Sequence, residues 1–187
     1  DLSMTDGFSG DLIDAVALGQ LDAAVINKPR RALTLKSETI ADEDLLLVMG
    51  PAHADVPASL RFSGMSALKL VFPTRRHGLR GIIENFAEAE DVHLSPSLEI
   101  DSISAILKLV RESDFCTLLP HVAVRGLLER AEVKVHRFVS PRLRRTIVAV
   151  TDPSRPLNPA AAAFLSALRR HLAGLGSVPP YGGDGLS

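Results

Sequence analysis

The sequence predicts an α/β fold with mixed, mostly parallel sheets, arranged as two lobes joined by two crossover strands. Segments of strand and helix character alternate along almost the whole chain. Two apolar runs of strand length, residues 45–49 and 145–150, separate the middle of the sequence from its two ends. We therefore assign residues 1–48 and 146–173 to lobe I, 49–145 to lobe II, and 174–187 to a flexible tail rich in glycine and proline.

The chain is expected to open with a strand over residues 1–5, a turn and a helix. Ser9 suits the start of this helix because its side chain can accept a backbone N–H, and apolar residues recur behind it at helical spacing. Gly19 stands where a left-handed C-cap ends a helix. The run Ala-Ala-Val-Ile at 23–26 has no polar alternation, which is typical of a strand covered on both faces.

The remaining elements follow from the same patterns. Residues 33–40 alternate like a strand with one solvated face, and 43–49 predict a separate, buried strand. Asn158 caps the last helix, with Pro159 in a favourable first position. The segments between predict, in order, a strand at 68–73, a helix at 78–89, a strand at 98–101, a helix opened by Ser102, a buried strand at 115–120, a helix at 121–130 and strands at 133–138 and 145–150.

Composition limits the function classes. The chain has 187 residues, 46% of them apolar, which is enough to bury a core. Its 21 lysines and arginines against 22 acidic residues leave no overall basic footprint for nucleic acid. The single cysteine, Cys116, excludes an internal disulfide and fits a reducing cytosol. No apolar run approaches the ~20 residues that span a bilayer. Because the first residue is not Met and lies in an expected strand, we interpret the chain as a fragment.

Four helix N-termini are expected to face the cleft between the lobes, at Ser9-Gly10, 74–79, Ser102 and Pro120-His121. Unpaired N–H groups and the positive ends of helix dipoles favour an anion or a carboxylate. Plain helix capping is the simpler interpretation of Ser9 and of Ser102 taken singly. Considered together, they predict that at least one of them contacts a ligand.

The turn Asp6-Gly7-Phe8-Ser9, followed by a helix and the step 18–25, resembles the effector-binding domain of LysR-type transcriptional regulators. Gly78-Leu79-Arg80, Asp101-Ser102 and 117–120 follow in the order and spacing of that family, so the resemblance covers residues 1–173. It implies a two-lobed fold of the type 2 periplasmic-binding class and a small effector between the lobes. It also implies a cytoplasmic homodimer, or a tetramer at full length, that reaches DNA only through a helix-turn-helix domain absent from this chain. Family domains begin with a further strand and helix, which this sequence lacks.

Within this resemblance, the predicted effector ligands come from the loops before the helices. The polar loop 74–80, with three arginines, can form a basic lip that pairs a carboxylate or can be an ordinary solvated loop, and His121 can face the cleft or simply start a helix. The family's dimer face maps to Leu12, Val16 and 22–26 and, on the other lobe, Ile82, Ile83 and Phe86, all of which also suit a core. The predicted ligand-binding residues are Gly7, Phe8, Ser9, Thr74, His77, Gly78, Ser102, Pro120 and His121.

The sequence does not predict an enzyme. The segment Gly7-Phe8-Ser9-Gly10-Asp11 lacks the last residue of a nucleophile elbow, and no phosphate-binding or dinucleotide motif is present. The six histidines have no metal-ligand spacing, and Cys116 in an apolar strand is interpreted as a small buried hydrophobe. We therefore expect no catalytic residue, metal or cofactor. The alternative function is a solute-binding protein of a transporter, which shares the two-lobed fold.

Overall fold

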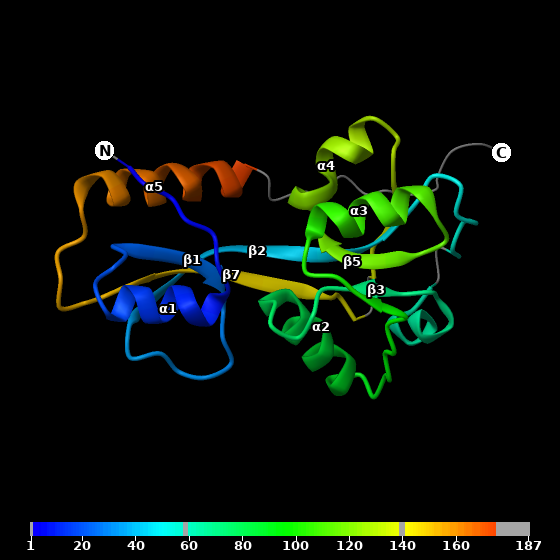
Figure 1. The fold of residues 1–187 in the computed structure, drawn as a ribbon, viewed down its shortest axis with the longest axis horizontal. Helices are drawn as coiled ribbons and strands as arrows, with labels where there is room; N and C mark the ends of the chain where they lie inside the picture. Colours follow the sequence, from blue (N-terminus) through cyan, green and yellow to red (C-terminus); the bar gives the residue numbers. More distant parts are fainter. Residues whose placement is uncertain (1, 58–59, 139–140, 175–187) are drawn as a thin grey trace. The chain divides into compact units, whose positions relative to one another are not determined.

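The computed structural model describes residues 2–57, 60–138 and 141–174. Its elements alternate in the manner of an α/β protein (Figure 1). In chain order they are α1 (Ser9–Ala17), β1 (Ala23–Asn27), β2 (Lys36–Met49), the 3₁₀ helix η1 (Phe62–Ala67), β3 (Val71–Phe72), α2 (Gly78–Ala89), β4 (Leu98–Glu99), α3 (Ile103–Glu112), β5 (Cys116–Pro120), α4 (His121–Glu129), β6 (Lys134–His136), β7 (Arg144–Thr151) and α5 (Pro159–Gly174).

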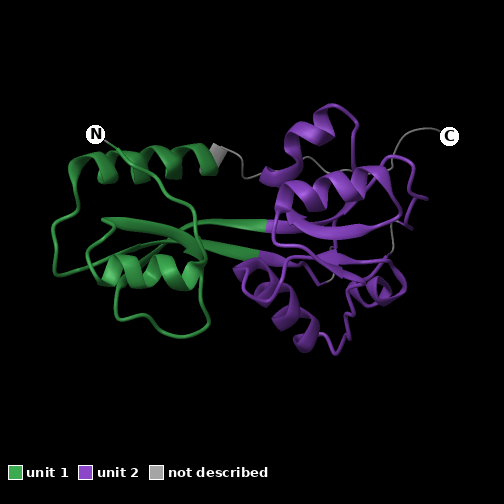
Figure 2. Cartoon of the chain, in the orientation of Figure 1, with its two compact units in different colours: residues 1–43, 145–177 green, residues 44–144, 178–187 purple. Residues whose placement is uncertain are grey.

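The chain divides into two compact units (Figure 2). Among the described residues, unit 1 holds 2–43 and 145–174, and unit 2 holds 44–57, 60–138 and 141–144. The chain passes from unit 1 to unit 2 inside β2 and returns inside β7, so the predicted α/β class with two crossover strands is confirmed. The assignment of these units as effector-domain lobes stays a prediction. The predicted tail, apart from Gly174, lies outside the described residues.

Unit 1 packs α1 and α5 on opposite sides of β1 and β7 (Figure 1). β1 pairs antiparallel with β7, from Ala23 opposite Thr151 to Asn27 opposite Ile147. The predicted cap of the last helix is confirmed, because Asn158 Oδ1 accepts a hydrogen bond from the N–H of Ala160 at 2.8 Å. The core of this unit is made of Val16, Ala24, Ile26, Val148 and Val150.

Two strand predictions in unit 1 are wrong. Residues 2–5 are not a strand, and Leu2 and Met4 are 52% and 74% exposed. No described strand pairs with them, and an extended segment needs such pairing for its backbone hydrogen bonds. The strand at 23–26 is not covered on both faces, because Val25 is exposed between the buried Ala24 and Ile26. β7 is its one described strand partner, so β1 is an edge strand with alternating burial.

The predicted strands 33–40 and 43–49 are a single strand of 14 residues, β2. The three acidic residues where the two predicted strands meet, Asp42 to Asp44, continue the strand, and each has a side-chain partner. Asp42 accepts a hydrogen bond from Thr146 at 2.6 Å, Glu43 pairs with Arg145 at 2.6 Å, and Asp44 pairs with Arg142 at 2.6 Å. The buried half of the strand, 45–49, then enters the core of unit 2 as expected.

Unit 2 contains both kinds of strand pairing. β2 pairs antiparallel with β5 and with β6, whereas β3 pairs parallel with β4 and a parallel bridge joins Leu70 to Cys116. The sheets are therefore mixed, as predicted, but the described pairings are not mostly parallel. The alternation of strands and helices predicts parallel neighbours, whereas the crossover strands β2 and β7 run opposite to the strands paired with them.

The helices of unit 2 agree with their sequence patterns. α2 spans the predicted 78–89 and buries Leu79, Ile83 and Ala87. α3 begins after Ser102 and buries Ile106 and Val110. Complete burial of Ile83, like that of Val16 in unit 1, identifies these two residues as core and contradicts their assignment to a dimer face.

Candidate functional site

Three strands of unit 2 lead into helices at the same edge. β3, β4 and β5 run parallel, so residues 73–77, 100–102 and 120–121 lie at the carboxyl ends of neighbouring strands. Loops lead from β3 to α2 and from β4 to α3, whereas β5 ends at Pro120 and α4 begins at the next residue, so all three helices begin at this edge. In open α/β sheets this is the edge that binds ligands. The topology therefore brings the loops of six predicted residues, Thr74, His77, Gly78, Ser102, Pro120 and His121, to one edge.

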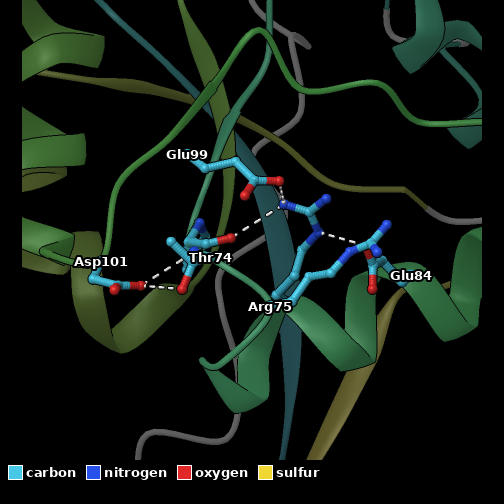
Figure 3. Close-up of polar contacts among 7 residues, drawn as sticks. Thr74, Arg75, Glu84, Glu99 and Asp101 are labelled. Carbon is cyan, nitrogen blue, oxygen red and sulfur yellow. Dashed lines mark hydrogen bonds and ion pairs between the residues drawn. The ribbon is translucent and has the colours of Figure 1, made fainter.

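Thr74 joins two of these loops through Asp101 (Figure 3). The Thr74 hydroxyl donates to Asp101 Oδ1 at 2.5 Å, and the Thr74 N–H donates to the same oxygen at 3.3 Å. This pair links the end of β3 to the start of α3 across 27 residues of sequence. The sequence pointed to Thr74 but not to Asp101 as its partner. The available signal is that Asp101, like Thr74, is a polar residue at the carboxyl end of a short strand.

A buried arginine supports the same edge. Arg80 on α2 is 3% exposed, and its guanidinium donates to Glu84 at 2.9 Å, to Glu99 at 3.0 Å and to the carbonyl of Pro73 at 3.1 Å. It thereby connects α2 with the ends of β3 and β4. Sequence reasoning missed this role, although Arg80 lies three residues before Ile83, on the apolar face of the helix.

Arg75 and Arg80 of the basic lip pair with carboxylates of the protein. Arg75 Nε lies 3.2 Å from Glu84 Oε1, the oxygen that also accepts from Arg80. The Arg75 side chain is 78% exposed, so this pair is weak and can exchange for another acceptor. Arg75 and Arg80 therefore share the carboxylates of Glu84 and Glu99 near Thr74. The charge of each arginine is paired.

The helix N-termini at this edge are capped in two different ways. His77 accepts from the N–H of Leu79 at 3.2 Å, and Ser102 accepts from the N–H of Ala105 at 3.3 Å, so both side chains cap their helices. Plain capping, the simpler interpretation of Ser102, is thus present. α4 follows Pro120, which supplies no side-chain cap. Its first-turn N–H groups are donors that a ligand can use.

The predicted ligand residues of unit 1 form a separate turn. Asp6 Oδ1 accepts from the N–H of Gly7 at 3.0 Å, and Phe8 is the N-cap of α1 without a side-chain cap bond. Ser9 is the first helical residue, so the expectation that it caps α1 is wrong by one position. A groove of about 580 Å³ in unit 1 is lined by residues of the segment 2–6, β1 and α5, and includes none of Gly7, Phe8 and Ser9.

Two features bear on reactive chemistry among the described residues. The described residues contain no group of three or more His, Cys, Asp and Glu side chains that could hold a metal ion. Cys116 is fully buried, with its Sγ 3.3 Å from His53 Nε2. Burial, followed by the negative charge of Asp114, raises the pKa of the Cys116 thiol to about 11, so it is a poor nucleophile. No described helix is long and apolar enough to span a bilayer.

The fold with its two crossover strands belongs to the type 2 periplasmic-binding class, in which a sheet edge of this kind holds small molecules. Within that class, the chain belongs to the LysR substrate binding domain family, which matches residues 1–173. It is therefore an effector-binding regulatory domain of a LysR-type transcriptional regulator, a family that binds small-molecule effectors and reaches DNA through a separate domain.

Solved structures agree in fold. The effector-binding domain of QuiR in complex with shikimate has a TM-score of 0.74 and 17% identity, over 91% of this chain and 81% of that one. The reduced regulatory domain of OxyR2 from Vibrio vulnificus has the same score and identity, over 89% and 78%. A variant of full-length OxyR from Pseudomonas aeruginosa matches with a TM-score of 0.71 and 22% identity, over 87% of this chain and 57% of that one.

Proposed function

We propose that this regulatory domain senses a small metabolite with an anionic group, bound at the unit 2 edge where β3, β4 and β5 end. The observation that carries the proposal is the convergence of three loop–helix junctions at this edge, in a chain of an effector-binding family. The hydroxyls of Thr74 and Ser102 and the first-turn N–H groups of α4 supply polar contacts there. The shikimate held by QuiR is a carboxylate, which makes carboxylates the first class to test.

We also propose a ligand-binding role for the unit 1 turn at Gly7, Phe8 and Ser9, argued from that turn alone. Its support is local: α1, like α4, has no side-chain cap hydrogen bond at its start, so its first N–H groups can donate to an anionic partner. His77 and Gly78, at the beginning of α2, and His121, at that of α4, complete the proposed set.

We further propose that the domain acts in the cytoplasm as a homodimer, or as a tetramer at full length, and that effector binding changes the packing of the subunits and so the position of separate DNA-binding domains. Exposed apolar residues support a surface for a second copy. Leu18 at the end of α1 is 73% exposed and Val25 on β1 is 36% exposed. The transporter alternative is not favoured, because the LysR family match covers residues 1–173.

The test is a thermal-shift titration of the purified chain with shikimate, other small carboxylates, amino acids and sulfate. We expect at least one acid to raise the melting temperature, and Thr74→Val and Ser102→Ala to abolish that rise. Each variant is compared with its own ligand-free state, because loss of the Ser102 cap alone costs about 1 kcal/mol. Thr39→Val and Ser63→Ala change exposed residues elsewhere and serve as matched controls. Full affinity in both site variants would refute this placement.

A further inference from the structure

The carboxylate of Asp101 is an unusual feature for a site proposed to hold an anion. Asp101 is exposed at the sheet edge and uses Oδ1 to accept both the hydroxyl and the N–H of Thr74. Within residues 2–57, 60–138 and 141–174, no lysine or arginine forms an ion pair with it, and its Oδ2 takes no hydrogen bond. An acceptor with a full negative charge therefore stands beside Thr74 (Figure 3).

The nearby arginines do not cancel this charge. Arg80 is buried and divides its donors between Glu84, Glu99 and a carbonyl oxygen, and Arg75 also pairs with Glu84. Arg75 and Arg80 thus pair with Glu84 and Glu99, and no ion pair of either arginine with Asp101 is described. A ligand carboxylate placed against Oδ2 would meet repulsion, whereas a hydroxyl or ammonium group would donate a charge-assisted hydrogen bond there.

We infer that Asp101 is a specificity-determining residue that selects effectors carrying a hydrogen-bond donor close to their anionic group. Hydroxy acids and amino acids satisfy this requirement, and plain carboxylic acids do not. The inference rests on the proposed function and adds to it a negatively charged hydrogen-bond acceptor beside the donors that bind the anionic group. The helix N-termini and the Ser102 hydroxyl donate to the acidic end of the effector, and Asp101 accepts from the effector's donor, because the Thr74 hydroxyl already donates to Asp101. A ligand without the donor displaces water from Asp101 Oδ2 and gives it no hydrogen bond in return, which is the costly case for a polar site.

The experiment uses pairs of acids that differ only in the donor. Shikimate is compared with cyclohex-1-ene-1-carboxylate, which lacks the ring hydroxyls, and lactate and alanine are each compared with propionate. Isothermal titration of the chain should show a preference of about tenfold or more for the donor-bearing member of at least one pair. In Asp101→Asn the preference should shrink to about threefold or less, because the neutral amide still accepts from Thr74 but no longer repels a plain carboxylate.

Asp114→Asn is the matched control, since Asp114 is exposed and precedes β5 and thus lies at the opposite edge of the sheet. It should keep the wild-type preference. Equal binding of both members of every pair by the wild-type chain overturns the inference and leaves the proposed function standing, and this comparison does not depend on any variant folding. An unchanged preference in Asp101→Asn also overturns it. Failure of every acid to bind overturns the proposed effector class and the inference together.

Discussion

At the scale of single residues, Gly19 ends α1 in the left-handed conformation predicted from the sequence, and a distant residue, Arg155, caps the same helix end. It has φ +76°, and the N–H groups of Gly19 and Gln20 donate to the carbonyls of Val16 and Ala15, which ends α1 in a Schellman motif. Arg155 adds a second cap by donating to the Val16 carbonyl at 2.5 Å. A Cβ at Gly19 would stand 1.8 Å from the guanidinium of Arg155, so both caps require glycine here.

We therefore predict that Gly19→Ala lowers the free energy of unfolding by about 1–2 kcal/mol, from the left-handed backbone and the displaced arginine together. Urea unfolding followed by circular dichroism measures the change. Gly10→Ala is the control within the same helix, since a Cβ there meets nothing within 4 Å and alanine favours the helix. A loss for Gly10→Ala as large as that for Gly19→Ala would contradict this account.

The buried thiol permits a second prediction at this scale. Because the pKa of Cys116 is raised from 9.0 to about 11, the thiolate fraction at pH 8 falls about 100-fold. Alkylation by iodoacetamide should be slower in the native protein than in urea by at least that factor. Cys116 is the one cysteine of the sequence, so mass spectrometry reports its modification without ambiguity. Equal rates in the native and unfolded protein would show that the thiol is accessible.

At the scale of elements, the buried guanidinium of Arg80 holds α2 against the ends of β3 and β4. Arg80→Met removes the shared partner of Glu84 and Glu99 and leaves the Pro73 carbonyl without its donor. We expect a loss of about 2 kcal/mol, below the usual range for a buried pair, because the two glutamates are 38% and 43% exposed. Arg125→Met removes an exposed i,i+4 pair with Glu129 on α4 and should cost about 0.5 kcal/mol or less. Equal losses in thermal or urea unfolding would refute the distinction.

The elements also show what could be predicted from sequence and what could not. Local signals were sufficient for α2, for the start of α3 at Ser102 and for the glycine at the end of α1, because the apolar spacing and capping residues stand within one helix. The sequence did not predict that β2 is one continuous strand, because the acidic residues in its middle pair with residues about 100 positions away, such as Thr146 and Arg145. The site was predicted in part for the same reason. The position of Thr74 just after a strand can be read from the sequence. Its hydrogen bond to Asp101 depends on the pairing of β3 with β4, which the sequence does not show.

At the scale of the whole molecule, acidic and basic residues balance at 22 and 21, and stability depends on how they pair. Five exposed or half-buried carboxyls have their pKa held below the ordinary value by hydrogen bonds, with Lys36 as the main cause for Glu38, Lys134 for Asp55, Lys69 for Asp114, Arg130 for Glu132 and Ser154 for Asp152. Because the folded pKa lies below the unfolded one, folding releases protons from these groups in acid. Their stabilisation is present above the ordinary pKa and is lost as pH falls through the folded values.

These groups occur in both units, Glu38 and Asp152 in unit 1 and the other three in unit 2, so acid should weaken each unit rather than one alone. We predict that the melting temperature changes little from pH 8 to 6 on account of these carboxyls and falls as the pH drops below the ordinary values of 4.5 for glutamate and 3.8 for aspartate. Calorimetry over a pH series measures this. Glu38→Gln removes the pairs with Lys36 and Arg169 and should flatten the acid slope, whereas Glu90→Gln, for which no ion pair is described, should not. Because exposed pairs are screened by salt, 1 M NaCl should flatten the slope too, and a slope indifferent to both salt and Glu38→Gln would assign the acid sensitivity to other groups.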